Sequence, residues 1–348
     1  MGQLDDYVRK LAIVSASDLL LSGGRLPLYR ALDGLSPLPG EGMLPEAELR
    51  EELERLLSPD EWQQLGDEQQ VSFSAELAEG LRVRGACHQA AHGLTLRLSL
   101  LGAQGDSVHD LELPTALAQL PDAEAGLIIV TGPRGSGKTT FVARVLSEIA
   151  AVRPVYIATS ENPVEYRLRG TSSVIVQRSV GQHCPSHASA LEAAIASEAQ
   201  VIACSELHAA GAAELMIEAA CAGALAIGEL PGASVVRTLE QLQLAEPSAA
   251  RVQWQADVAD SLHAVVALDL VPKKDGGQVW AAEILLATRN VCGLIRDGKL
   301  SMLAGLLDRE SGMQSMDRCL LDLATRGIID GREAYARASD KRVLSAWA

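Results

Sequence analysis

The chain is poor in aromatic residues, and it lacks both paired cysteines and long apolar runs. Only 3% of its 348 residues are aromatic while 48% are hydrophobic, so its core must be built from aliphatic side chains. The six cysteines form no C-x-x-C pair, which favours free thiols in a reducing compartment. No stretch reaches the roughly eighteen uninterrupted apolar residues typical of a membrane-spanning helix.

An excess of positive charge is also missing. Lys and Arg number 30 against 45 Asp and Glu, a net charge of −15. Binding to nucleic acid requires a basic face, so the composition argues against that class of partner. The amino terminus, MGQLDDYVRKLAIVSAS, has two early acids and no sustained apolar block, unlike a signal peptide. We therefore expect a cytoplasmic protein, long enough for two domains of ordinary size.

Histidine and cysteine residues fall in two short groups that invite interpretation as metal sites. These groups are Cys87, His88 and His92, and then His183, Cys184 and His187. Neither group is followed by a second ligand pair at the spacing of a zinc site. Ordinary surface or core residues are therefore the favoured interpretation.

Hydrophobic periodicity divides the chain into three parts. Residues 1–120 are predicted to form an α+β domain, because the helical pattern LPEAELREELERLLSPDEWQQL occurs among the strand-like segments SASDLLLS, VSFSAEL, LRVRGAC and GLTLRLSLL. LELPTALAQLPDAEAG then predicts a short helix and a linker. In residues 121–290 apolar runs alternate with helical stretches, which predicts a sheet with helices on both faces. Residues 291–348 are predicted to be helical.

The segment LIIVTGPRGSGKTT has the form of a phosphate-binding loop. It matches G-x-x-x-x-G-K-[ST], follows an apolar strand and opens a helix-compatible stretch, as this kind of site requires. Lys138 is expected to reach the β- and γ-phosphates of ATP, and the hydroxyl of Thr139 to bind Mg²⁺. Backbone N–H groups of the loop would surround the phosphates. The predicted nucleotide-binding residues are Gly132, Pro133, Gly135, Ser136, Gly137, Lys138, Thr139 and Thr140.

Two glutamates are candidates for catalysis. Glu206 ends the apolar run QVIACSE, where a Walker B carboxylate beside Mg²⁺ and the attacking water is expected. Glu161 lies in the polar turn TSENPVEYRL between that run and the phosphate loop. Glu206 could also be an ordinary solvent-exposed acid at the end of a strand, although its register with the phosphate loop favours a role in the site.

Together these motifs resemble the twitching-motility (PilT-type) retraction ATPases of type IV pili, within the type II secretion and type IV pilus motor superfamily. The resemblance runs over nearly the whole chain. ASDLLLSGGRLPLYR is similar to the family's opening segment, GPRGSGKTT to its Walker A motif and ENPVEY to its Asp box, with VQR after that box. The carboxy-terminal segments AAEILLATRNVCGLIRDGKL and GMQSMDRCLLDLATRGIID resemble retraction ATPases more than extension or secretion ATPases, and no tetracysteine motif is present.

The resemblance implies a fold and an assembly. The fold would be a RecA-like P-loop ATPase core with a smaller PAS-like α+β domain at the amino terminus and a helical carboxy-terminal segment. The subunits would form a cytoplasmic hexameric ring that binds ATP between domains and neighbouring subunits. Such a ring would act on an inner-membrane platform protein to depolymerise the pilus, with Glu161 as the catalytic glutamate.

At several positions near the expected catalytic site, the residue in this chain differs from the residue typical of the family. Asn162 replaces one acid of the Asp box, while Ser205 and His208 replace a glycine and an arginine around Glu206. In the segment GELPG, Glu229, Pro231 and Gly232 lie where the family has Thr-Leu-His-Thr, and Glu229 beside the γ-phosphate is expected to repel it. The substituted positions in other segments are Ala86 and His88, after the matching Arg84, and Ala196 in place of an arginine.

These differences leave two hypotheses. The first is an active retraction-class ATPase whose turnover is slow, because an arginine on the transferred phosphoryl group contributes ~10³–10⁵ in rate. The second is a nucleotide-binding paralogue with impaired hydrolysis, acting as a regulatory or structural subunit, alone or in a ring with an active ATPase. A small-molecule kinase is disfavoured because the full-length resemblance leaves no segment for a substrate lid.

Overall fold

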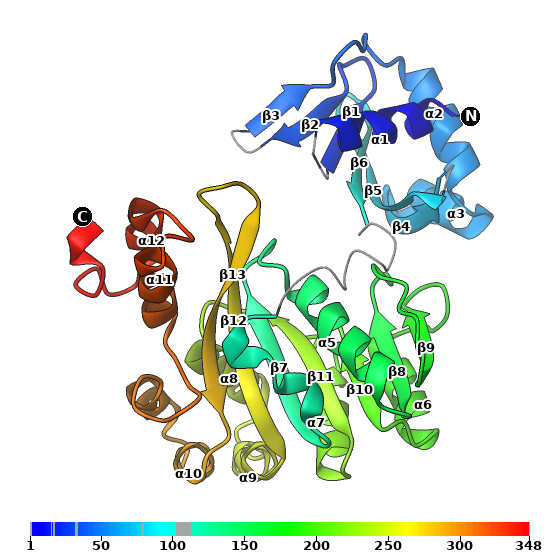
Figure 1. Cartoon of the computed structure of the whole chain (residues 1–348). Helices are drawn as coiled ribbons and strands as arrows, with labels where there is room; N and C mark the ends of the chain where they lie inside the picture. Colours follow the sequence, from blue (N-terminus) through cyan, green and yellow to red (C-terminus); the bar gives the residue numbers. More distant parts are fainter. Residues whose placement is uncertain are drawn as a thin grey trace. The chain divides into compact units, whose positions relative to one another are not determined.

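The chain folds into two compact units, residues 1–104 and 105–348. The computed structural model describes residues 2–14, 16, 18–31, 34–77, 80–101 and 113–347 (Figure 1). Each unit has its own sheet and its own hydrophobic core. The three-part division predicted from the sequence, at residues 120 and 290, stays a prediction.

The described residues of the first unit form a six-stranded antiparallel sheet and three helices. The strand order is β3-β2-β1-β6-β5-β4. Its elements are α1 (Gln3–Ile13), β1 (Asp18–Ser22), β2 (Leu28–Ala31), β3 (Gly34–Pro37), α2 (Glu46–Leu56), α3 (Pro59–Glu68), β4 (Gln70–Glu76), β5 (Arg82–Ala90) and β6 (Gly93–Leu100). Leucines of α1, α2, β1 and β6 fill the core between sheet and helices.

A capping box divides the predicted helix at residues 44–65 into α2 and α3. The Ser58 hydroxyl accepts the backbone N–H of Glu61, and the Glu61 carboxylate accepts the backbone N–H of Ser58. Pro59 follows at the first helical position, where its missing N–H costs nothing. The local sequence therefore starts a second helix in the middle of one periodic pattern.

The second unit has a seven-stranded sheet in the order β13-β12-β7-β11-β10-β8-β9, which runs from left to right in Figure 1. All pairings are parallel except that of β12 with β13. Its strands are β7 (Gly126–Gly132), β8 (Tyr156–Glu161), β9 (Val174–Ser179), β10 (Val201–Cys204), β11 (Leu225–Pro231), β12 (Leu262–Pro272) and β13 (Gln278–Leu286). The central strands are continuous apolar runs because both of their faces are covered.

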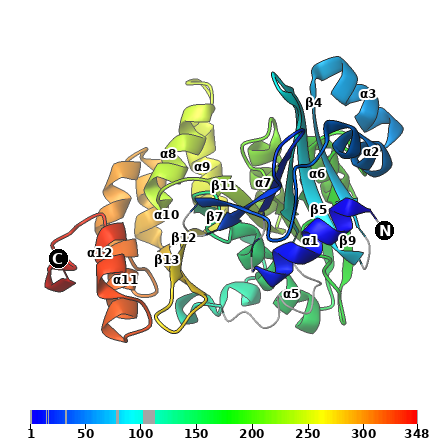
Figure 2. The ribbon, with the colours of Figure 1, turned by 90° about the horizontal axis from the view of Figure 1, so that it is seen from above.

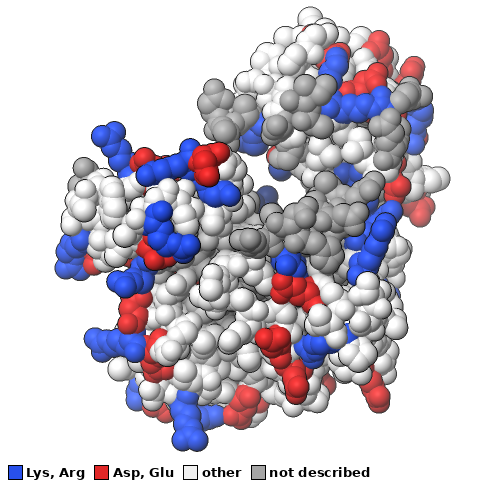
Figure 3. Space-filling model, in the orientation of Figure 1, with Lys and Arg blue, Asp and Glu red and all other residues white. Residues whose placement is uncertain are grey.

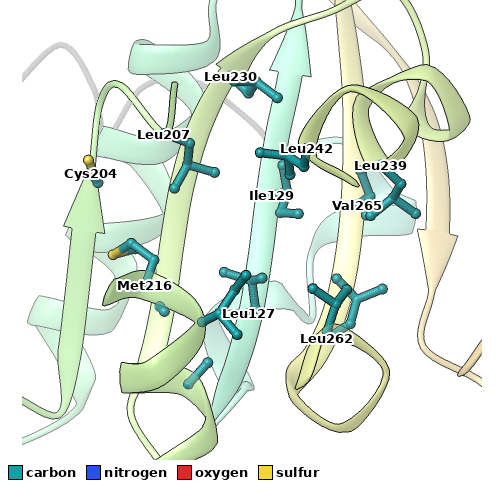
Figure 4. Close-up of a cluster of buried hydrophobic side chains, with 14 of the residues drawn as sticks. Leu127, Ile129, Cys204, Leu207, Met216, Leu230, Leu239, Leu242, Leu262 and Val265 are labelled. Carbon is teal, nitrogen blue, oxygen red and sulfur yellow. The ribbon is translucent and has the colours of Figure 1, made fainter. Parts of the chain in front are cut away.

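Helices cover the two faces of this sheet, with α5 on one side and α8 and α9 on the other (Figure 2). Figure 4 shows one of the two cores, where Leu127 and Ile129 of β7 face Met216 of α7 and Leu242 of α8. The helices of the unit are η2 (Thr115–Leu117), η3 (Leu120–Asp122), α5 (Lys138–Val152), α6 (His187–Ala196), α7 (Ala212–Cys221), α8 (Val235–Ala245), α9 (Arg251–Ser261), α10 (Arg289–Arg296), η4 (Leu300–Leu306), α11 (Met316–Thr325), α12 (Gly331–Arg337) and η5 (Ser345–Trp347).

The carboxy-terminal helices form a small core of their own. Leu320 and Leu323 of α11 and Ala334 of α12 pack against Val271 of β12 and Ala281 of β13. On the outside of α11 and α12, acidic and basic side chains are interspersed (Figure 3), and several form ion pairs along the helices. These pairs are exposed, so each contributes little to stability.

The predicted fold class is confirmed: an α/β core, an α+β amino-terminal unit and a helical carboxy-terminal segment. The sequence reading missed α1 and the β12–β13 hairpin. It expected a short helix and linker at 111–126, where the structure has two 3₁₀ turns; residues 111 and 112 lie outside the described residues. In the described part of the chain, no helix combines the length and apolar character that a bilayer span requires.

We predict that Gly85→Ala destabilises the first unit by about 1–3 kcal/mol, the cost typical of overpacking. Gly85 pairs with Phe73 across β4 and β5, and a Cβ at residue 85 would lie 2.1 Å from Cζ of the phenyl ring. Urea denaturation followed by circular dichroism measures the change. Gly66→Ala is the matched control, because Gly66 lies inside α3 with nothing within 4 Å of an added Cβ. This control should stabilise by about 0.5–1 kcal/mol; an equal loss in both variants would contradict the packing account.

Candidate functional site

Four polar groups gather where parallel strands of the second unit end. β7 runs into the predicted phosphate loop, β8 ends at Glu161, Glu206 follows β10 and Glu229 lies near the end of β11. Because parallel strands share one carboxyl edge, these positions converge at that edge, where ligands bind in open α/β sheets. The structure thereby brings together both predicted catalytic glutamates and the loop.

The shape of the phosphate loop depends on glycine at its two ends. Gly132 has φ 150° and Gly137 has φ 81°, both in the region that favours glycine. A Cβ at Gly132 would lie 2.4 Å from the carbonyl oxygen of Leu268, and one at Gly137 would lie 2.6 Å from Nε1 of Trp280. α5 starts at Lys138, so the N–H groups of its first turn are directed toward the loop.

The loop residues fit a phosphate chain. The Nζ of Lys138 donates to the carbonyl oxygens of Gly132 and Pro133, each at 2.9 Å, so the lysine is held over the loop. The buried hydroxyl of Ser136 has no hydrogen-bond partner among the residues that the structure describes. A Cβ built on Gly135 meets nothing within 4 Å, which leaves the top of the loop open. A phosphate group would supply acceptors for these donors.

Glu229 forms a hydrogen bond with Thr139, the predicted magnesium ligand. The hydroxyl of Thr139 donates to Oε2 of Glu229 at 2.9 Å, and the carboxyl group is 5% exposed. Burial raises the pKa of Glu229 to about 8, with Glu165 and Glu161 acting in the same direction and the Thr139 hydrogen bond and Lys138 opposing it. The sequence reading placed Glu229 only beside the γ-phosphate; it did not anticipate its bond to Thr139.

The donor set at this position suits Mg²⁺. Hydroxyl and carboxyl oxygens are the protein ligands that Mg²⁺ prefers, and Thr139, Glu161 and Glu229 line one cavity. The cavity has a volume of about 20 Å³. That is room for about one water molecule. Thr139 and Glu229 are therefore the residues that could hold the ion or its water ligands.

Glu161 is held rigidly by neighbours on β8 and β9. Its Oε1 accepts hydrogen bonds from the hydroxyl of Thr159 at 2.5 Å and from Nε2 of Gln177 at 2.9 Å. Gln177 is itself fixed, since its Nε2 also donates to the carbonyl of Tyr166 and its Oε1 accepts the N–H of Leu168. Burial raises the pKa of Glu161 above its usual value, while these hydrogen bonds lower it. A fixed carboxyl group with a raised pKa is suited to accept a proton.

Glu206 lies among residues at which the chain departs from the family pattern. Nδ2 of Asn162 is 3.4 Å from its Oε1, and Nε2 of His187 and of His208 are 3.7 and 4.0 Å from its Oε2. The backbone N–H of Asn162 donates to the hydroxyl of Ser205. The amide at 162, where the family has an acid, thus faces Glu206 as a hydrogen-bond donor.

The segment GELPG, which lies where the family has Thr-Leu-His-Thr, is tightly packed against β7. Pro231 pairs with Gly132, and the hydroxyls of Thr131 and Thr238 lie 2.9 Å apart. A Cβ at Gly232 would come within 2.4 Å of the Thr131 hydroxyl oxygen and 2.6 Å of that of Thr238. Glycine at this position therefore makes room for the threonine pair.

Other predicted positions do not join this cluster. Ala196 ends α6, and the next residue, Ser197, contacts Tyr156 at the start of β8, so Ala196 lies at the opposite edge of the sheet. An arginine at residue 196 could therefore not reach the nucleotide of its own subunit. Arg84 is an exposed residue of β5 in the first unit.

Among the described residues, neither His/Cys group brings its three side chains together as metal ligands. Cys87 is buried in the core of the first unit while His88 and His92 are exposed, and Nδ1 of His183 accepts the N–H of Ser179. His187 instead faces Glu206. Throughout the described ranges, no group of three or more His, Cys, Asp or Glu side chains could hold a metal ion.

Sequence reasoning missed the residues that support the site. Tyr166, whose hydroxyl lies 2.8 Å from that of Thr140, has no motif of its own. Thr159 and Ser160 were expected in the polar turn TSENPVEYRL and given no role, whereas the structure places both in β8. Gln177 was noticed only through the family resemblance, and His187 only as a potential metal ligand.

Known proteins resemble the chain in both sequence and structure. Residues 94–292 match the family described as "Type II/IV secretion system protein". A twitching motility protein of Neisseria gonorrhoeae is 30% identical over 279 residues, 79% of this chain and 75% of its own. The type IV pilus retraction ATPase PilT of Pseudomonas aeruginosa is 26% identical over 93% of this chain and 94% of its own.

A solved structure agrees with these relatives. The crystal structure of the pilus retraction motor PilT with bound ADP has a TM-score of 0.87 and 28% identity to the chain, covering 99% of both proteins. The RecA-like core with its smaller amino-terminal domain, expected from the resemblance, is thereby confirmed. The chain therefore belongs to the type II/IV secretion system protein family, in the class of the pilus-retraction and secretion ATPases.

Proposed function

We propose that the chain is an ATP-hydrolysing motor subunit that drives pilus disassembly and twitching motility. One observation carries the proposal: Lys138, Thr139, Glu161 and Glu206 lie at one edge of the sheet around a single phosphate loop. The relatives named as a twitching motility protein and a retraction ATPase support pilus retraction as the work performed. The subunit would act in a homo-hexamer or mixed ring on an inner-membrane platform protein, from the cytoplasmic side.

In this proposal each residue has a distinct task. The loop N–H groups and Lys138 bind the phosphates, with the lysine exchanging two carbonyl oxygens for phosphate oxygens. Thr139 and Glu229 would hold Mg²⁺, which when bound would supply positive charge beside the transferred phosphoryl group. Glu161, fixed by Thr159 and Gln177, accepts the proton of the attacking water, and Glu206 orients that water.

The same geometry favours slow hydrolysis. Pro231 takes the place of the family's histidine and has no N–H or side-chain donor for a phosphate oxygen. The Thr139 hydroxyl is engaged by Glu229, so ion binding must rearrange a buried hydrogen bond. This engagement also favours a second candidate function, a nucleotide-binding regulatory or structural subunit with impaired hydrolysis in a ring with an active ATPase.

Lys138→Ala should weaken Mg·ATP binding by about ten- to a hundredfold, the loss expected for a hydrogen bond to a charged group. Isothermal titration calorimetry measures the affinity. Lys299→Ala, which removes an exposed lysine paired with Asp297, is the control and should bind normally. Unchanged affinity in the Lys138 variant would refute the phosphate-loop assignment.

Glu161→Gln and Glu206→Gln should each lower phosphate release at least about a hundredfold and leave Mg·ATP affinity intact. Each change keeps the side-chain volume and removes the negative charge. Steady-state phosphate release and binding are measured on the same samples. A parallel loss of binding and turnover would argue for a structural role, and wild-type binding without turnover would favour the regulatory subunit.

The stability of the nucleotide-free protein should fall more steeply with rising pH than that of Glu229→Gln. The pKa of Glu229 is raised from its ordinary 4.5 to about 8, so the folded state holds a proton that the unfolded state releases. The stabilisation is complete below pH 4.5 and is lost as pH rises toward 8, by at most about 1.4 kcal/mol per pH unit. Urea denaturation from pH 5 to 8 tests this. Parallel pH profiles in the two proteins would mean that the buried carboxyl group is already ionised.

A further inference from the structure

A buried histidine outside the predicted site lies beside Glu206. His187 is the first residue of α6 and is only 4% exposed. The hydroxyl of Ser186 caps this helix by accepting the N–H of Ser189. In the sequence this residue had no interpretation other than a possible metal ligand.

The Nδ1 side of the ring faces the hydroxyl of Ser160 and the thiol of Cys204. The hydroxyl oxygen of Ser160 is 2.8 Å from Nδ1 and the sulfur of Cys204 is 3.7 Å from it. A hydroxyl group can donate to Nδ1, whereas the carboxylate of Glu206 on the Nε2 side can only accept a hydrogen bond. The arrangement with the hydrogen on Nε2 and with Nδ1 as the acceptor therefore suits both sides of the ring.

The Nε2 side faces Glu206. This nitrogen is buried and has no hydrogen-bond partner within the described residues, and Oε2 of Glu206 is 3.7 Å away. A buried N–H without an acceptor is unfavourable, so a small movement that closes this distance is favoured. Catalytic hydrogen bonds are often long in the absence of ligand and shorten in the loaded enzyme.

We propose that His187 is a positioning residue for Glu206, to which it donates its Nε2–H and so fixes the carboxylate for ATP hydrolysis. The inference rests on the proposed function, because it requires that Glu206 act on bound ATP. Asn162 approaches the other oxygen of the same carboxylate, so the two donors together define its orientation. The hydroxyl of Ser160 contacts Nδ1, on the side of the ring away from Glu206.

Ser160, His187 and Glu206 do not form a nucleophilic triad. Ser160 is 1% exposed, so no substrate carbonyl or phosphoryl group can reach its hydroxyl. The positioning role uses the same contacts without requiring access to Ser160.

Two substitutions separate hydrogen bonding from packing. His187→Phe keeps an aromatic ring of similar size and removes the donor, while His187→Gln keeps an N–H that can reach toward Glu206. We expect His187→Phe to lower kcat by about ten- to a hundredfold, the cost of a misplaced catalytic group, with KM and Mg·ADP affinity unchanged. His187→Gln should retain most of the wild-type kcat.

A second readout does not depend on turnover. Binding of Mg·ADP with aluminium fluoride, which mimics the transferred phosphoryl group, should weaken about tenfold or more in His187→Phe. In a Glu206→Gln background the same substitution should have no further effect, because the carboxylate it positions is gone. His263→Phe is the control, since His263 lies near the start of β12, at the edge of the sheet opposite the loop.

The possible results separate the two proposals. A wild-type protein that fails to bind Mg·ATP overturns the proposed function and this inference with it. Normal binding with equal kcat in wild type and His187→Phe overturns the inference alone, as does an effect that persists in the Glu206→Gln background. Normal wild-type binding with no turnover and no tightening by aluminium fluoride also overturns it, while nucleotide binding stands. The inference is confirmed if kcat falls in His187→Phe, stays near the wild-type value in His187→Gln and is unchanged in the control variant His263→Phe.

Discussion

The structure of the site depends on the parallel pairing of β7 with β11 and β12. These strands are buried on both faces, so their polar groups can only be placed where the strands end. The pairing register brings Glu229 opposite Val130 and Pro231 opposite Gly132, one strand away from the start of the loop. A shift by one residue would turn Glu229 to the other face of the sheet and separate it from Thr139.

The fold and the loop could be predicted from the sequence because both depend on local patterns. The phosphate loop is indicated by features that lie within a few residues of one another: the apolar run before Gly132, the glycine spacing and Lys138. The hydrogen bond from Thr139 to Glu229 joins residues 90 positions apart, so no local sequence pattern predicts it. His187 was noticed and misread because its partners Ser160, Cys204 and Glu206 come from other elements. The β12–β13 hairpin was missed although its residues are strand-like, because β12 holds no motif and the part of β13 within AAEILLATRNVCGLIRDGKL was used only for the family resemblance.

Several departures from the family pattern are connected in space. Asn162, Ser205 and His208 lie around Glu206, and Gly232 admits the contact between Thr131 and Thr238. In the sequence each of these substitutions indicated a loss of catalytic chemistry. In the structure they lie together around a retained glutamate and beside the phosphate-loop strand. This pattern favours a site adapted to a different arrangement over a site that has decayed.

The lysine of the phosphate loop has partners even without a ligand, since two loop carbonyls hold its ammonium group. These carbonyls are available again when a product departs, so the charge of Lys138 does not have to return to a buried position unpaired. When a product leaves, Lys138 therefore exchanges phosphate oxygens for the two loop carbonyl oxygens. In many enzymes the departure of product limits the rate of the cycle. The loop thus has a ligand-free state in which the ammonium group of Lys138 keeps two hydrogen-bond partners.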